Sequence, residues 1–301
     1  MPRVTLEDET LRDGLQAEAM VWPTEAKLDL AENLVKAGVR RLQVGSFVNP
    51  KYLPQMADTE EVIRRLRLPS DVLLTALVLN RRGLERALAC GLGHLSMSVS
   101  VSDQHSRRNV RKPARQALEE MTQLIREAVA AGVTVRAGAQ CAFGCVYQGA
   151  IPEKELLSAV EAMAQAGARE LNLADTTGMA HPWQVQDVVG KVRDLFPEMK
   201  LSLHLHDTRG LGLANMFAGY QAGVSLFDVA LGGLGGCPFV KGAAGNVPTE
   251  DAANMFEQAG IRTGIDIQLL CNVVERLQDV AGRPLPGRMA YLQRSAKGKE
   301  E

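Results

Sequence analysis

The chain has 301 residues, of which 46% are hydrophobic and 23% charged, as is typical of soluble globular domains. Its 34 Lys and Arg nearly balance its 35 Asp and Glu, so we expect no nucleic-acid partner and no membrane partner attracted by charge, and no apolar run approaches the roughly 18 residues of a spanning helix. Five dispersed cysteines without a Cys-x-x-Cys pair, and an N-terminus that leads straight into a strand-like pattern, favour a reducing cytoplasmic location without disulfides or a signal peptide.

Short apolar runs alternate with amphipathic stretches along the chain, and no linker or low-complexity segment interrupts them before the tail. The runs with strand character lie at residues 4–9, 41–47, 72–78, 94–101, 133–141, 170–175, 201–206 and 226–231. Helical patterns lie between them at residues 24–37, 58–66, 80–89, 112–131, 152–166, 182–196 and 211–222, and two more follow at 249–258 and 266–280. Glycine ends several of these helices just before a strand, as in KAGV, AAGV and QAGV.

Eight strands that alternate with helices predict an α/β fold with a parallel sheet, and eight is the number that closes a (β/α)8 TIM barrel. A doubly wound open sheet is the alternative. Such a sheet normally has a glycine-rich phosphate loop after its first strand, where this chain has ETLRDGLQAE. We therefore expect one barrel domain over residues 1–286 and a charged, frayed tail over residues 287–301.

Two histidines share one face of the seventh predicted strand. In LSLHLHD, Leu201, Leu203 and Leu205 alternate with Ser202, His204 and His206, so the two imidazoles point the same way at the end of a barrel strand. Buried core histidines are the alternative, but two at this spacing can bind one metal ion. Asp13, after the first strand, is the natural carboxylate ligand, and Asn246, after the eighth, is a plausible amide ligand. Two nitrogen and two oxygen ligands without a thiolate suit Mg²⁺ or Mn²⁺, for which Zn²⁺ or Co²⁺ could substitute.

A glycine-rich segment, GGLGGCPFVKGAAGN at residues 232–246, follows the eighth predicted strand, where a barrel would carry a lid loop. Cys237 within it is a candidate acid or base, and a buried bystander in a flexible loop is the alternative. Arg12, beside Asp13, either stabilises a developing oxyanion or forms a structural ion pair with Glu7 or Glu9.

Two other segments have weaker signals. Cys141 and Cys145, four residues apart, are spaced poorly for a metal and are interpreted as packing residues. His105, Arg107 and Arg108 follow the fourth strand, where they either contact a phosphorylated cofactor or form a solvated basic loop.

Taken together, these motifs resemble the metal-dependent lyases and Claisen-type enzymes typified by 3-hydroxy-3-methylglutaryl-CoA lyase, within the DRE-TIM metallolyases. The resemblance runs from about Val4 to Val280. It rests on LRDGLQAE, GSFVNPKYLPQMAD, CAFGCVYQG, LADTTGMAHP, HLHDTRGLGLAN and GGLGGCPFVKGAAGNVPTED. Sequences similar to LRDG and HxHD also occur in isopropylmalate and homocitrate synthases and in pyruvate-dependent aldolases, whereas GGCPxxxGxxGN with SFVNPK indicates the lyase branch.

The resemblance implies a role for each matching residue. The family's metal ligands fall on Asp13, His204, His206 and Asn246, its catalytic arginine on Arg12, its loop cysteine on Cys237, a proton-transfer carboxylate on Asp175, and residues near the substrate on Gln16, Ser46 and Tyr147. One position departs from the pattern. The family's second strand carries a glutamate in IEVxSFVxPK, and this chain has Gln43 there, in LQVGSFVNPK.

The activity that the resemblance implies is retro-Claisen cleavage of an acyl-CoA thioester, 3-hydroxy-3-methylglutaryl-CoA, to acetyl-CoA and acetoacetate, as in leucine degradation. A homodimer is also implied. Because of Gln43, a different 3-hydroxy-3-substituted acyl-CoA is the first alternative. A pyruvate-type aldolase, a condensing synthase and a non-catalytic barrel are the others.

Overall fold

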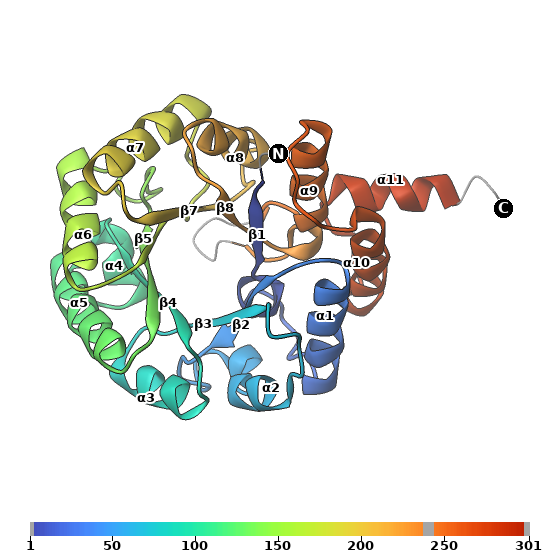
Figure 1. The fold of residues 1–301 in the computed structure, drawn as a ribbon, viewed down its shortest axis with the longest axis horizontal. Coiled ribbons are helices and arrows are strands. Elements are labelled where there is room, and N and C mark those ends of the chain that lie inside the picture. The colour runs from blue at the N-terminus through green and yellow to red at the C-terminus, as the bar shows by residue number, and fades with distance from the viewer. Residues whose placement is uncertain (1–2, 237–243, 298–301) are drawn as a thin grey trace.

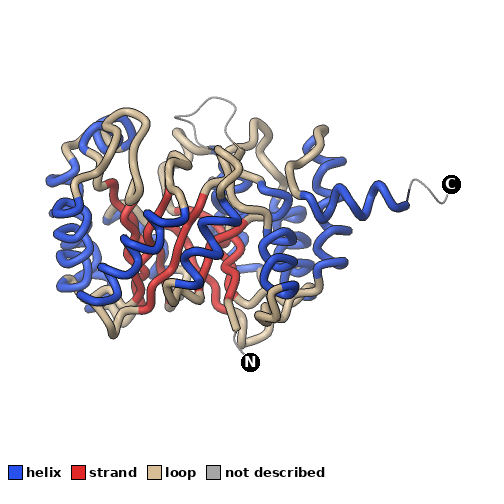
Figure 2. The backbone as a smooth tube through the Cα atoms, turned by 90° about the horizontal axis from the view of Figure 1, so that it is seen from above, coloured by secondary structure: helices blue, strands red, loops and turns tan. Residues whose placement is uncertain are grey.

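The computed structural model describes residues 3–236 and 244–297. Eight parallel strands close into a barrel in chain order, with β1 hydrogen-bonded to both β2 and β8. The helices form a ring outside the strands (Figures 1 and 2). The expected (β/α)8 barrel is therefore confirmed, and no helix in these ranges is long and apolar enough to span a membrane.

The strand bounds lie within two residues of the predicted ones. The strands are β1 Thr5–Asp8, β2 Arg41–Ser46, β3 Leu73–Leu77, β4 His94–Ser100, β5 Thr134–Gln140, β6 Glu170–Asp175, β7 Lys200–Leu205 and β8 Leu226–Val229. The helices are α1 Thr24–Lys36, α2 Thr59–Arg65, α3 Arg81–Ala89, α4 Asp103–Asn109, α5 Ala114–Ala130, α6 Glu153–Gln165, α7 Pro182–Leu195, α8 Gly212–Gln221, α9 Thr249–Gln258, α10 Ile267–Ala281 and α11 Arg288–Lys297, with short turns η1 Thr10–Gly14, η2 Pro54–Met56 and η3 Leu231–Gly233.

The frayed tail is a correction, because residues 288–297 form helix α11. The backbone amides of Arg288 and Met289 each donate to the Asp251 carboxylate over 2.8 Å, which satisfies two amides at the start of the helix. Ala290 is buried, and α11 extends beyond the rim of the barrel (Figure 1). The basic loop after the fourth strand also proves to be a helix, α4, whose first turn is capped by Ser102 through a hydrogen bond from the amide of His105.

The two faces of the strands differ in chemistry. Leu95, Met97 and Val99 of β4 are buried and belong to the apolar core. The alternate residues of the strands point into the barrel, where many are polar, and charged side chains meet there across the ring. Arg136 of β5, only 1% exposed, pairs with Asp228 of β8 over 2.6 Å.

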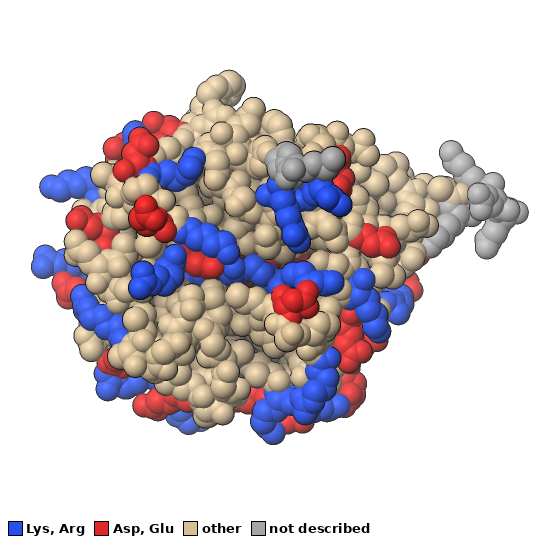
Figure 3. Space-filling model, viewed as in Figure 1, with Lys and Arg blue, Asp and Glu red and all other residues tan. Residues whose placement is uncertain are grey.

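Buried charged residues form a continuous ionic network in the barrel interior. Arg41 donates to both oxygens of Glu170 over 3.0 and 2.7 Å and to Glu7 over 2.6 Å. Arg136 then pairs with Glu7 over 2.7 Å and with Asp228. At the other end of the network, half-exposed Lys200 pairs with Glu170 over 3.2 Å. Lys200 stands at the start of β7, on the side of the barrel where the N-terminus lies and where a band of Lys and Arg crosses the surface (Figure 3).

Candidate metal centre and active site

The turn after β1 brings Arg12 and Asp13 to the barrel mouth. Residues Thr10–Gly14 form a single turn of π-helix, an irregular element often found at functional sites. Asp8 anchors the turn, because it accepts a hydrogen bond from the Thr10 amide over 2.9 Å and another from the Thr249 hydroxyl over 2.6 Å. This local geometry could not be predicted from the motif LRDG alone.

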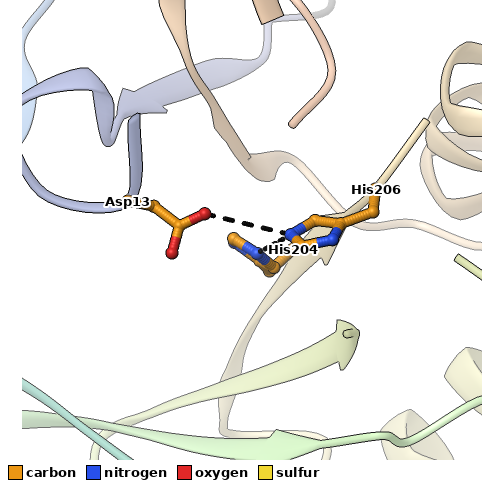
Figure 4. A group of neighbouring side chains, drawn as sticks. All are labelled: Asp13, His204 and His206. Carbon is orange, nitrogen blue, oxygen red and sulfur yellow. Dashed lines mark hydrogen bonds and ion pairs between the residues drawn. The ribbon is translucent and has the colours of Figure 1, made fainter. Parts of the chain in front are cut away.

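His204 and His206 converge at the carboxyl end of β7, as the alternation predicted. Their Nε2 atoms lie 3.0 Å apart, and Asp13 Oδ2 lies 3.9 Å from His206 Nε2 (Figure 4). The three side chains offer ligand atoms within 4.8 Å of one another. The sequence prediction that these residues come together is therefore correct.

A second group of carboxylates holds the other nitrogen of His204. Its Nδ1 lies 3.4 Å from Asp228 and 3.5 Å from Glu9, both buried beneath the mouth. A carboxylate that accepts the Nδ1 hydrogen leaves the Nε2 lone pair free for a metal ion. Glu9, His204 and Asp228 are themselves close enough to form a metal cluster, but this contact is better explained as the orientation of His204.

Asn246 completes the predicted ligand group. It pairs with His206 in an isolated β-bridge, and its amide nitrogen donates to Asp13 Oδ2 over 2.8 Å and to the carbonyl of Leu234 over 3.0 Å. Its Oδ1 is buried and finds no hydrogen-bond partner among the described residues. An unpaired buried acceptor costs free energy, which a bound cation would relieve. The two Nε2 atoms are close enough to bind the same ion when neither carries a hydrogen, so these residues fit a divalent ion.

The protonation of two ligands also suits a metal. Burial favours the neutral form of Asp13, but Arg12, His204 and His206 outweigh it and lower the Asp13 pKa to about 2. Burial lowers the pKa of His206 to about 4. At neutral pH, Asp13 is therefore ionised and His206 neutral, which are the forms that bind metals.

Arg12 lies among three acceptors. Its guanidinium pairs with Glu9 and Asp13, and its Nε donates to the side-chain oxygen of Gln43. The structural ion pair with Glu9 is thus real, while the pairing with Glu7 does not form. Arg12 also lines the cavity above the metal ligands, so a structural contact and a catalytic role are compatible.

Glu9 is a residue that the sequence analysis considered only as an ion-pair partner. Burial raises the pKa of its carboxyl to about 8 against the opposing attraction of Arg12. Its oxygens nevertheless accept from Arg12, from Gln43 over 2.7 Å and from Arg136 over 3.1 Å. Because these neighbours donate hydrogen bonds, the surroundings are those of an ionised carboxylate.

Asp175 lies at the end of β6 but has a clear structural role. Its two oxygens accept the backbone amides of Met179 over 2.8 Å and Ala180 over 3.0 Å, which fixes the loop between β6 and α7. Burial raises its pKa above the usual range. The proton-transfer role that the resemblance implied stays a prediction.

The predicted substrate residues divide into two groups. Gln16 lines the cavity, and Gln43 is buried beside Arg12. Ser46 and Tyr147 are not among the described residues that line the cavity; Ser46 is buried, and Arg108 stacks on the Tyr147 ring at 4.1 Å from its centroid.

The cysteines and the basic segment have different outcomes. Cys237 falls in residues 237–243, outside the described residues, so its role stays a prediction. Cys141 and Cys145 are buried, in agreement with packing. Arg107 pairs with Asp103 on the exposed side of α4 rather than lining the cavity.

A cavity of about 1300 Å³ opens above the metal ligands and continues past α4 and α5. The ligand side chains Asp13, His204 and His206 share its lining with basic residues, Arg81, Arg111 and Lys112. The cavity can therefore hold a substrate much larger than its reacting end.

Comparisons with known proteins agree with this geometry. A family model described as HMGL-like matches residues 3–277. An (R)-citramalyl-CoA lyase of Chloroflexus aurantiacus is 40% identical over 95% of this chain and 93% of its own, and a hydroxymethylglutaryl-CoA lyase of Bacillus subtilis is 36% identical over 98% of both. The fold is similar to a solved HMG-CoA lyase of Acinetobacter baumannii in complex with coenzyme A and 3-methylmalate, with a TM-score of 0.91 at 39% identity over 96% of this chain and 94% of that one. The chain belongs to the HMGL-like family of carbon–carbon lyases.

Proposed function

We propose that the chain is a divalent-metal-dependent lyase that cleaves 3-hydroxy-3-methylglutaryl-CoA to acetyl-CoA and acetoacetate. The observation that carries the proposal is the convergence of Asp13, His204 and His206 at the mouth of the barrel, with Arg12 beside them. Family membership supports the reaction class. The fold alone would not support it, because TIM barrels are found in enzymes that catalyse many different reactions.

Asp13, His204, His206 and Asn246 would hold the ion, for which we propose Mg²⁺ or Mn²⁺. When bound, such an ion supplies Lewis acidity toward the hydroxyl and carboxylate oxygens of the substrate. Asp228 and Glu9 keep His204 in the orientation that binding needs.

The proton steps are assigned to two other residues. The family resemblance assigns removal of the 3-hydroxyl proton to Asp175, whose two oxygens accept backbone amides in this structure. The C2–C3 bond then breaks, C3 becomes a carbonyl carbon, and the electron pair passes into the thioester enolate. Arg12 stabilises that negative charge, and the Cys237 thiol protonates C2 to give acetyl-CoA.

The cavity suits the acyl-CoA thioester. It continues from the metal ligands to Arg81, Arg111 and Lys112. Arg81 pairs with Glu127 and Lys112 with Glu120, whereas Arg111 has no ion pair among the described residues and can attract a phosphate of coenzyme A. The HMG-CoA lyase solved with coenzyme A and 3-methylmalate supports a substrate of this class. A homodimer and a cytoplasmic location remain part of the proposal.

A second candidate substrate is (R)-citramalyl-CoA, which would give acetyl-CoA and pyruvate by the same bond cleavage. Its hydroxyl-bearing carbon carries the carboxylate directly, one methylene closer than in 3-hydroxy-3-methylglutaryl-CoA. The relative named for this substrate is 40% identical to the chain, against 36% for the lyase from Bacillus subtilis. Gln43, where the family pattern has a glutamate, is the residue of this chain that points to a changed substrate.

The test is a turnover assay of the purified protein with each thioester, supplied with Mg²⁺ or Mn²⁺ and then with EDTA. We expect metal-dependent acetyl-CoA release, with acetoacetate or pyruvate identifying the substrate. His204→Ala is the matched control and should lose both metal and turnover. Turnover that persists in EDTA, or no cleavage of either thioester by metal-loaded protein, would contradict the proposal and favour an aldolase or a non-catalytic barrel.

A further inference from the structure

Gln43 is bonded on both sides of its amide. It is fully buried on β2, its oxygen accepts from Arg12 Nε, and its nitrogen donates to Glu9 Oε1 over 2.7 Å. Arginine can only donate, so the contact with Arg12 fixes the orientation of the amide. The amide nitrogen must therefore face Glu9.

Glu9 lies at the end of β1, immediately before the π-turn that carries Arg12. It is 1% exposed, and its Oε2 pairs directly with Arg12. The other acid on Arg12 is Asp13, which belongs to the proposed metal ligands. Because Asp13 would bind the metal ion, Glu9 is the carboxylate paired with Arg12 that can balance the charge of the guanidinium.

In the family pattern, the second strand carries a carboxylate at the position of Gln43. This chain has a neutral amide there and a carboxylate one strand away, within hydrogen-bond distance of that amide. In this chain the carboxylate beside Arg12 therefore follows β1, while position 43 on β2 carries no charge.

We infer that Glu9 is the positioning residue for Arg12, with Gln43 as the neutral bridge between them. This inference rests on the proposed function for its catalytic consequence. Arg12 is held through Nη2 by Glu9 and through Nε by Gln43, which fixes one edge of the guanidinium near the place where enolate charge develops. A carboxylate at position 43 would place a second acid against Glu9 and repel it.

The experiment exchanges the two groups. Glu9→Gln, Gln43→Glu and the double variant E9Q/Q43E are nearly isosteric, and the double variant restores one carboxylate beside Arg12 in the place where the family pattern has it. We expect E9Q to lower kcat at least about tenfold with KM within about threefold, because a transition-state contact weakens more than substrate binding. The double variant should recover to within about threefold of the wild-type kcat.

Glu250→Gln is the matched control, since it also removes a fully buried carboxylate but lies away from Arg12. Its kcat should stay at the wild-type value at pH 7. Mn²⁺ content and melting temperature are measured for each variant, because Glu9 also lies near His204. Loss of metal in E9Q would assign the effect to His204 and overturn the inference.

The position of Arg12 is a readout that does not depend on turnover. Crystal structures should show the guanidinium displaced in E9Q and returned to place in E9Q/Q43E. Wild-type kcat and an unmoved Arg12 in E9Q, or a double variant as impaired as E9Q with full metal content, would overturn the inference. If the wild-type protein cleaves neither thioester, the proposed function fails, and the Arg12 positions still decide the positioning role.

Discussion

Replacing Arg136 with methionine tests whether the ionic network supports the barrel. Arg136 is buried and pairs with Glu7, Glu9 and Asp228. In Arg136→Met, Glu7 would keep Arg41 and Glu9 would keep Arg12, whereas Asp228 would lose its arginine partner. The loss therefore corresponds to one broken buried pair, which costs about 3–5 kcal/mol in the free energy of unfolding. That is a large part of the 5–15 kcal/mol typical of a protein.

The assay is guanidinium unfolding of metal-free protein at pH 7, followed by circular dichroism and by tryptophan fluorescence, whose coincidence justifies a two-state fit. Asp228→Asn in the Arg136→Met background removes the unpaired charge. We expect this double variant to be more stable than Arg136→Met alone. Arg115→Met is the exposed control: it breaks an ion pair with Glu119 on the surface of α5 and should cost less than about 0.5 kcal/mol.

The pH dependence has a definite sign. Burial would raise the pKa of Asp228, but Arg136 outweighs it and holds the pKa below its ordinary value. A depressed carboxyl pKa contributes stability above the unfolded pKa, and this contribution is lost as pH falls. The cost of Arg136→Met should therefore be largest at neutral pH and shrink below about pH 4. A cost under about 1 kcal/mol at pH 7, or a double variant as unstable as the sum of the single ones, would refute the reasoning.

The other predictions concern a metal ligand, the loop cysteine and a buried acid. His204→Ala should weaken Mn²⁺ binding by more than the roughly 10–100-fold that loss of an orienting neighbour costs, as measured by titration calorimetry, and unchanged affinity would contradict its role as a ligand. Cys237→Ser should lower kcat by about 10²–10⁴-fold with metal content intact, and loss of metal instead would indicate a structural role. Burial raises the pKa of Glu250 to about 8, so its ionised form opposes folding and the protein loses stability as pH rises toward 8. Glu250→Gln, which can keep the hydrogen bond from the amide of Gly232, should raise the melting temperature at pH 9 and change it less at pH 6; an equal shift at both pH values would count against this.

The barrel could be predicted because each strand is a short apolar run between helices, and glycines in the sequence mark where several of these helices end. The metal ligands His204 and His206 could be predicted for a related reason, since alternation on a single strand places both imidazoles on one face. Asp13 and Asn246 followed from the closed ring, which brings the first and last loops together. Helix α11 was missed because its start depends on Asp251, a distant residue whose contacts the sequence does not show.

The ionic network was missed although the sequence holds a signal for it. The alternation that identified the two histidines also occurs elsewhere, in Glu7 on β1 with Glu9 just after it, and in Arg41 and Gln43 on β2. A charged residue inside an apolar run is usually assigned to the solvent-exposed face of a strand. In a closed barrel that face is the interior, and which charges meet across it depends on the strand register.

The same ionic network links the two ends of the barrel. In most barrels of this fold, residues at the amino ends of the strands serve stability and those at the carboxyl ends serve catalysis. Here half-exposed Lys200 connects through Glu170, Arg41, Glu7 and Arg136 to Asp228, which orients His204. Unbroken ion pairs therefore join the surface at the amino ends of the strands to the carboxylate that orients His204, although the two lie at opposite ends of the barrel.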